Sequence, residues 1–261
     1  MIGAAGSRGR VSGTGARVRA ILAWLARRGS RRNVEGMARY GIVARHVFGV
    51  SVATLRDLAK QLGRDHGLAV ALWDTGVFEA RMLTAFVDDP ALVTPAQMDR
   101  WVKDFDNWAI CDALCFHLFD RTPHAWTKVG MWSRRRGEFQ KRAAFALLAG
   151  LALHDKAAAD GPFAKALPLI ARSASDGRNY VKKGVSWALR AIGNRSPALN
   201  AKAIALSRRL VVSKEPAARW VGRDALRELT GPIVQKRLRT RGVRRTPRRA
   251  PAGSRARGRS A

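Results

Sequence analysis

The chain has 261 residues, of which 47% are hydrophobic, enough to bury one sizeable core. It carries 49 Lys and Arg residues against 19 Asp and Glu residues, a formal net charge of +30. A folded protein with this excess repels itself unless it meets a polyanion, so nucleic acid is the favoured partner. An anionic membrane is the weaker alternative, because no stretch of about 18 residues is purely apolar.

The N-terminal segment, residues 1–16, consists mainly of Gly, Ser, Arg and Ala and has no apolar face, so we expect it to be disordered. A first helix is predicted at about 17–28. Its apolar run, residues 21–26, is too short for a secretory signal and is followed by Arg27 and Arg28. The chain has only two cysteines and no disulfide framework is expected, so a reducing, intracellular setting is favoured, in the cytoplasm and associated with the nucleoid.

Helix signals recur along the chain, and no run alternates with the period of two that a strand requires. Ser51 is a helix N-cap before residues 52–62, and Gly63 is the C-cap. The segment 94–97 is a capping box with proline at the first helical position. Four later dipeptides show the same pattern of a helix start, with proline at the first helical position: Thr122-Pro123, Gly161-Pro162, Ser196-Pro197 and Glu215-Pro216. Further helices are predicted at about 67–74, 77–87, 107–118, 139–154, 179–192, 198–211 and 217–229.

About a dozen short helices with brief connections favour stacked helical pairs of about 35–45 residues each, as in HEAT or armadillo arrays. The predicted fold is an all-α solenoid over residues 17–237, with an irregular helical bundle as the alternative. Residues 238–261 are predicted to be a disordered, Arg-rich tail, which either tracks DNA phosphates or is a solvated tail without a partner. The body, residues 17–230, still carries 36 basic residues against all 19 acidic ones.

The stretch DNWAICD, residues 106–112, places Trp108 and Asp112 four apart and so on one helix face. On this spacing alone, the favoured interpretation is structural, with Trp108 in the core and Asp112 exposed or capping a neighbour. Arg142 follows Trp108 by 34 residues, and Trp187 follows Arg142 by 45. In a solenoid of helical pairs these steps put one residue on each of three consecutive repeats, on the same concave surface. The sequence thus predicts one patch with two indoles, a carboxylate and a guanidinium.

From about Met37 to Leu229 the chain resembles the AlkD-like DNA alkylation repair glycosylases, which are built from HEAT-like repeats. Asn107-Trp108 with Asp112 resembles the catalytic Trp-x-x-x-Asp of that family. Two departures are Ala109, where some members have an acid, and Arg142, which here follows Phe139-Gln140-Lys141 rather than a turn that contains Trp. The other matching segments are Gly36-Met37-Ala38-Arg39-Tyr40, Phe48-Gly49-Val50, Leu72-Trp73, Glu79-Ala80-Arg81, Gln140-Lys141-Arg142-Ala143-Ala144 and Trp187-Ala188-Leu189-Arg190.

The resemblance implies a monofunctional DNA glycosylase with a basic concave face that hydrolyses the N-glycosidic bond of cationic N3- or N7-alkylated purines in duplex DNA. A non-catalytic HEAT-like DNA-binding or scaffold protein is the alternative. The catalytic residues would be Asp112, Trp108 and Trp187. We expect DNA contacts from Arg142, which matches the phosphate-gripping arginine of the family, and from Lys141, Lys182, Lys183, Arg190 and Tyr40, although each lysine is as readily a solvated charge.

The chemistry is consistent with these residues. A cationic alkylpurine departs as a neutral base without a general acid, so one carboxylate can stabilise the sugar cation and position water. Two indole faces attract the cationic lesion and sugar. No lysine lies within the Trp108–Asp112 motif, which argues against Schiff-base lyase chemistry.

The remaining candidates point to structure. Cys111 and Cys115 are the only cysteines; their spacing suits two thiols on one helix face rather than a disulfide framework or, with His117, a zinc site. No metal and no cofactor are expected, and we expect a monomer without an obligate protein partner. Glu79 is expected to be an inter-helix hydrogen-bond partner rather than a second catalytic acid. Five other tryptophans are expected to be packing residues: Trp24, Trp73, Trp101, Trp126 and Trp132.

Overall fold

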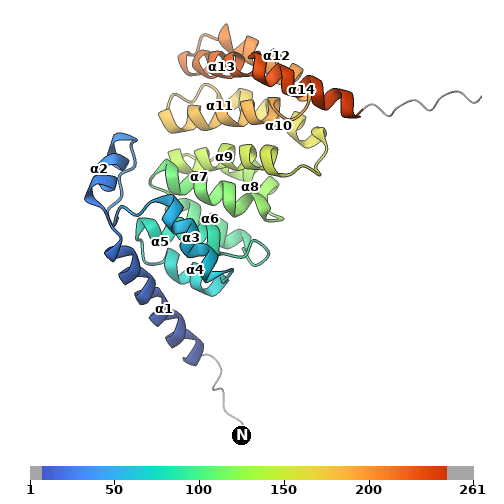
Figure 1. The fold of residues 1–261 in the computed structure, drawn as a ribbon. Helices are drawn as coiled ribbons and strands as arrows, with labels where there is room; N and C mark the ends of the chain where they lie inside the picture. Colours follow the sequence, from blue (N-terminus) through green and yellow to red (C-terminus); the bar gives the residue numbers. More distant parts are fainter. Residues whose placement is uncertain (1–7, 246–261) are drawn as a thin grey trace, which may run out of the picture.

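The computed structural model describes the backbone of residues 8–245 and the side chains of residues 13–240. Over the described residues the chain forms fourteen α-helices and one 3-10 turn, and no strand (Figure 1). The first half of this described part contains α1 (Arg8–Arg27), α2 (Arg31–Arg39), α3 (Val52–Leu62), α4 (His66–Trp73), α5 (Phe78–Val87), α6 (Pro95–Lys103), α7 (Trp108–His117) and the 3-10 turn η1 (Phe119–Arg121).

The second half of the described part contains the other seven helices. They are α8 (Ala125–Trp132), α9 (Glu138–His154), α10 (Asp160–Ser173), α11 (Asn179–Gly193), α12 (Pro197–Val211), α13 (Pro216–Leu229) and α14 (Pro232–Arg245).

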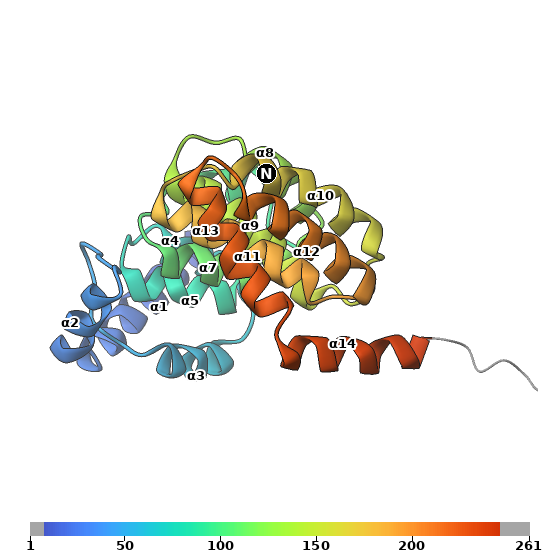
Figure 2. The same ribbon diagram turned by 90° about the horizontal axis from the view of Figure 1, so that it is seen from above.

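The helices stack in two rows, and the stack rises from α1 to α13 (Figure 1). One row consists of α3, α5, α7, α9, α11 and α13, in which each helix contacts the next. The second row consists of α4, α8, α10 and α12, which pack against the first row (Figure 2). The prediction of an all-α helical-repeat solenoid is therefore confirmed, whereas the basic character of its concave face stays a prediction.

The middle of the stack is held by α9, which is buried on all sides because α7, α8 and α11 surround it. Its residues 142–152 are all buried. Cys111 and Cys115 are buried on the face of α7 that packs on α9, where their thiols donate to the carbonyls of Phe139 and Ala143. The prediction that both thiols share one helix face is confirmed.

Several helices begin where the sequence predicts, because the capping side chain is present. Ser51 accepts a hydrogen bond from the Thr54 backbone at 3.2 Å, and Thr94 does the same for Gln97 at 3.1 Å. The opening predicted at Thr122-Pro123 is wrong. The Thr122 hydroxyl instead donates to the carbonyl of Phe119, closing η1, and α8 begins only at residue 125.

The expected boundaries at the two ends also need correction. The predicted disorder of residues 1–16 is wrong for 8–16, which form the first turns of α1. Buried Ile21 and Leu25 fix the later turns of this helix, and extending a formed helix costs far less than starting one. The predicted disorder of 238–261 is wrong for 238–245, where α14 continues, because Val234 and Leu238 lie one turn apart and are both buried. The expectations for residues 1–7 and 246–261 lie outside the described residues.

Candidate active site

The N-terminal end of α7 positions the first two predicted catalytic residues. The Asn107 side chain caps the helix by accepting from the backbone of Ile110 at 3.0 Å. Trp108 is then the first helical residue, Asp112 follows one turn later and Phe116 one turn after that. These three side chains share one face of α7, where Asp112 bonds to Arg142 of α9 and Phe116 stacks on Trp187 of α11.

Asp112 is paired with Arg142 of α9. The guanidinium donates to both carboxylate oxygens, from Nε at 2.8 Å and from a terminal nitrogen at 2.6 Å. Its other terminal nitrogen donates to the carbonyl of Tyr180 on α11, at 2.8 Å. Arg142 thereby links three consecutive helices of the row.

The surroundings oppose the charge of this carboxylate. Burial raises the pKa of the Asp112 carboxyl above its ordinary value, and the Arg142 guanidinium acts in the opposite direction. Two N–H donors that face both oxygens favour the ionised form. The site therefore holds a negative charge where water screens it poorly, and there a charge acts strongly on a nearby cation.

Two adjoining hollows open on this ion pair. The first, of about 550 Å³, is lined by Arg39, Tyr40, Gly41, Trp108, Asn179 and Tyr180. The second, of about 410 Å³, is lined by Trp187, Arg190 and Trp220. Asp112, Arg142 and Lys183 line both hollows.

The two predicted indoles lie on either side of the carboxylate. Trp108 lines the first hollow, and its ring N–H donates to the carbonyl of Tyr40 at 2.9 Å. Trp187 lines the second hollow and stacks on Phe116, with ring centroids 5.7 Å apart and planes at 27°. Both indoles are half-buried, so each keeps an accessible ring surface. The structure thus brings together the four residues that the repeat spacing predicted to meet.

A strap formed by α2 and the following loop, residues 31–48, lies at the edge of the first hollow. None of the residues in α2 is buried, and the strap is fastened at its tip by two successive carbonyls. Trp108 donates to the first, as above, and the Tyr180 hydroxyl donates to that of Gly41 at 3.3 Å. Gly41 has φ +71°, and a Cβ there would lie 2.4 Å from the Tyr180 hydroxyl, so this position requires glycine.

The base of the strap is anchored by Glu79, which is fully buried on α5. Its carboxylate accepts from the backbone N–H groups of Phe48, Gly49 and Val50, at 2.6–3.2 Å. The prediction that Glu79 is a hydrogen-bond partner is confirmed, but its partners lie in the connection before α3 and not on a neighbouring helix, as was predicted. It lies with the backbone of the strap's base rather than beside Asp112.

The predicted DNA contacts fall into two groups. Lys183 is exposed beside the carboxylate, and Tyr40 is 75% exposed at the first hollow. Arg190 lines the second hollow, but it pairs with Glu228 at 2.5 Å and with Asp224 at 3.5 Å, so two carboxylates offset its charge.

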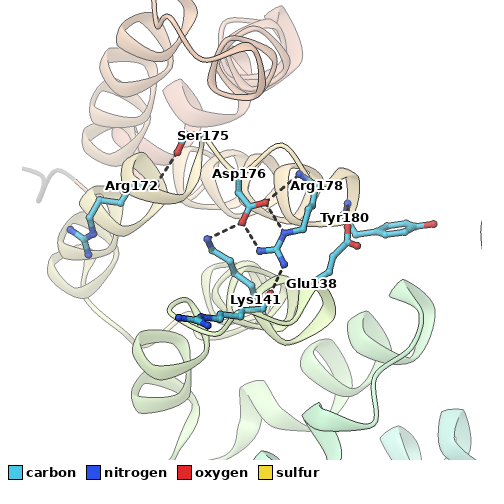
Figure 3. Close-up of polar contacts among 8 residues, drawn as sticks. Glu138, Lys141, Arg172, Ser175, Asp176, Arg178 and Tyr180 are labelled. Carbon is cyan, nitrogen blue, oxygen red and sulfur yellow. Dashed lines mark hydrogen bonds and ion pairs between the residues drawn. The ribbon is translucent and has the colours of Figure 1, made fainter.

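Lys141 and Lys182 are engaged by the protein itself. Lys141 donates to Asp176 at 2.9 Å, in a cluster with Arg178 next to the start of α11 (Figure 3). The ammonium of Lys182 lies 5.4 Å from the ring centroid of Trp220. Arg142 was expected to extend along the groove toward a phosphate, and the structure instead directs it at Asp112.

The sequence analysis missed Trp220, Arg39 and Tyr180, which line the hollows. A signal existed for Trp220, because it follows Trp187 by 33 residues, about one repeat, and lies on the next helix of the same row. Arg39 and Tyr180 carry no comparable signal, since their placement depends on the docking of the strap.

The fold and this site define a HEAT-like helical-repeat protein with an acidic centre between two indoles. The sequence model described as "DNA alkylation repair enzyme" matches residues 21–229, and the chain belongs to this family. No curated relative matches the sequence.

Among solved structures, one similar protein is described as belonging to "a new family of proteins related to the HEAT-like repeat DNA glycosylases with affinity for branched DNA structures". It is 16% identical with a TM-score of 0.70, over 85% of this chain and 95% of that one, and it supports the fold. A designed armadillo repeat protein in complex with the peptide (KR)4 is 14% identical over 73% of this chain and 80% of that one. Its TM-score of 0.35 is too low to carry an argument. Family and fold together place the chain among DNA repair proteins.

Proposed function

We propose that this protein is a monofunctional DNA glycosylase that hydrolyses the N-glycosidic bond of cationic N3- or N7-alkylated purines in duplex DNA. The observation that carries the proposal is the position of Asp112. Its carboxylate lies between two half-exposed indoles, at the junction of two open hollows lined by basic side chains.

The reaction requires of the protein mainly that charged and aromatic groups are held in fixed positions around the sugar and the base. The bond between C1′ and the purine nitrogen breaks, and its electron pair neutralises the cationic base, which leaves without protonation. The sugar becomes positive at C1′ and takes up water, which loses a proton and gives an abasic site. Asp112 would stabilise the sugar cation and orient the water, and the faces of Trp108 and Trp187 would attract the same positive charge.

Arg142 would position the carboxylate and still reach a phosphate. A guanidinium has five N–H groups. Three of those of Arg142 have partners in the described residues, two on Asp112 and one on the Tyr180 carbonyl. The two that remain, together with exposed Lys183, would bind the backbone beside the lesion. Water as the nucleophile leaves the strand uncut, so the product is an intact strand with an abasic site.

A second candidate is a DNA-binding or scaffold protein without catalysis. The bidentate pair favours it, because Arg142 partly neutralises Asp112 before any DNA arrives. The structurally similar protein with affinity for branched DNA shows that this fold is found in proteins described by binding. Both candidates predict DNA binding, so binding alone does not separate them.

Release of the free base separates them. Methylated duplex DNA is incubated with excess protein, and free 7-methylguanine and 3-methyladenine are measured by chromatography over time. The glycosylase predicts time-dependent release that Asp112→Asn slows by about 10²-fold or more, with no strand cleavage before alkali. Binding of the same duplex without release of either base would refute the glycosylase and support the second candidate.

A further inference from the structure

The second hollow contains an aromatic surface that the chemistry at Asp112 does not use. All eight tryptophans lie within the described residues, and three of them, Trp73, Trp101 and Trp132, are fully buried in the core. Trp220 on α13 is the exposed one, with 37% of its surface accessible. Single exposed apolar side chains are common and need no explanation, but Trp220 lines a hollow together with a second indole.

The cations around this ring suit a phosphate backbone. Lys182 and Lys183 are adjacent on α11. Lys182 reaches across to the Trp220 ring, while Lys183 lines both hollows. Arg190 is offset by Asp224 and Glu228, so the two lysines supply the net positive charge at this position. Aromatic faces interleaved with lysines are the pattern by which proteins hold unpaired nucleotides, through stacking on the base and contact with its phosphates.

A base in a regular duplex cannot stack on Trp220, because its two faces are covered by its neighbours. Only a base displaced from the stack presents a free face. Asp112 and Arg142 line this hollow together with Trp220, although Trp220 on α13 lies three helices of the row beyond the carboxylate on α7, and one beyond Trp187 on α11.

We infer that Trp220, Lys182 and Lys183 form a second nucleotide subsite next to Trp187, and that this subsite takes an unpaired base of the DNA beside the damaged nucleotide. The inference rests on the proposed function, which sets the path of the DNA. The subsite adds a preferred class of DNA to that function. Duplexes with an unpaired nucleotide should bind more tightly than fully paired ones, and this preference should depend on the ring of Trp220.

Binding to undamaged DNA tests the subsite without excision. The probes are a fully paired duplex and the same duplex with a single-nucleotide bulge that contains 2-aminopurine. The full-length wild-type protein should bind the bulged duplex about 10-fold more tightly, the range expected for one base stacked on one aromatic ring. The 2-aminopurine fluorescence should fall on binding, because stacking quenches it.

The variants assign the preference to the ring. Trp220→Leu keeps apolar bulk and should reduce the preference to about 2-fold or less, whereas Trp220→Phe keeps a ring and should retain most of it. Lys182→Ala with Lys183→Ala should weaken binding of both duplexes by similar factors. Met131→Ala removes another exposed apolar side chain, on α8 in the opposite row, and should change nothing.

Two results would overturn the subsite: equal binding of the two duplexes by the wild type, or an undiminished preference in a folded Trp220→Leu variant. Thermal unfolding of each variant checks the fold. The outcome is independent of the glycosylase test, because these probes contain no alkylated base. If the protein shows the Trp220-dependent preference but releases no base from methylated duplex in the separate excision assay, the proposed reaction is refuted and the subsite is still supported.

Discussion

Two aspartate–arginine pairs lie near the start of neighbouring helices of the same row, and they differ in almost every physical respect. Asp112 and Arg142 face the two hollows, with 20% and 8% of their side chains exposed. Asp176 and Arg178 lie in the connection from α10 to α11, where Asp176 also accepts from Lys141 (Figure 3). In the second cluster Asp176 is 11% exposed, less than Asp112, whereas Arg178 is 38% exposed and its charge is open to water.

Their surroundings shift the two carboxyls in opposite directions. Hydrogen bonds from Arg178, and then from Lys141, hold the pKa of Asp176 well below its usual range, although burial opposes them. Burial raises the pKa of Asp112 against the effect of Arg142. At neutral pH the Asp176 cluster therefore contributes to stability, whereas the charge of Asp112 costs stability. A charged group that lowers the stability of the fold is typical of a functional site. A charged group that raises the stability is typical of a structural site.

The largest effect that tests this contrast is on the reaction. Asp112→Asn keeps the size of the side chain and removes its negative charge, and should slow single-turnover excision of 7-methylguanine by about 10²-fold or more. Affinity for undamaged duplex should not fall, because the lost charge repels phosphate. Asp176→Asn is the matched control and should excise at the wild-type rate. Wild-type excision by Asp112→Asn would remove the catalytic assignment.

The arginines should differ in stability. Arg142→Gln leaves a largely buried carboxylate without its charged partner and should lower the free energy of unfolding by about 2 kcal/mol. Arg178→Gln removes a more exposed charge and should cost under about 1 kcal/mol. Urea denaturation of both variants at pH 7 measures the difference. Equal costs would mean that the burial of the Asp112 pair does not set its energetics.

Acid should change the two carboxylates in opposite senses. Asp176 has a lowered pKa, so its contribution, about 1 kcal/mol at pH 7, is lost as pH falls below about 4, and the stability gap between wild type and Asp176→Asn should close. Asp112 has a raised pKa, so the wild type should gain stability relative to Asp112→Asn as pH falls from 7 toward 4. Denaturation at several pH values follows both gaps, and parallel changes would contradict the contrast.

The smallest effect concerns the arginines at the C-terminal end of the sequence. Deletion of residues 246–261 removes five arginines, Arg248, Arg249, Arg255, Arg257 and Arg259, and spares α14. Affinity for undamaged duplex should weaken, and the slope of log K against log salt should become shallower by about 1 to 4. Excision at saturating protein should stay at the wild-type rate. An unchanged slope would show that these arginines do not contact DNA.

The sequence predicted what depends on local chemistry and on repeat length. Ser51 and Thr94 mark helix starts because the cap is made within four residues. The meeting of Trp108, Asp112, Arg142 and Trp187 followed from steps of about one repeat. The direction of Arg142 could not be predicted, because a guanidinium on this face can reach either a phosphate or the carboxylate of the previous helix. The strap was missed because α2 has no buried stripe and its fastening comes from residues far along the chain.

The fastening of the strap has a consequence for the order of folding. Tyr40 is held by a residue 68 positions later, and Gly41 by one 139 positions later. Neither bond can form before α7 and α11 are stacked, so we expect the strap to dock late, after the repeats that it bridges. With no buried residue in α2, it should also be among the first segments to open, exchanging its amide hydrogens well before the core of α9. The rim of the candidate site is then completed only once the solenoid behind it is intact.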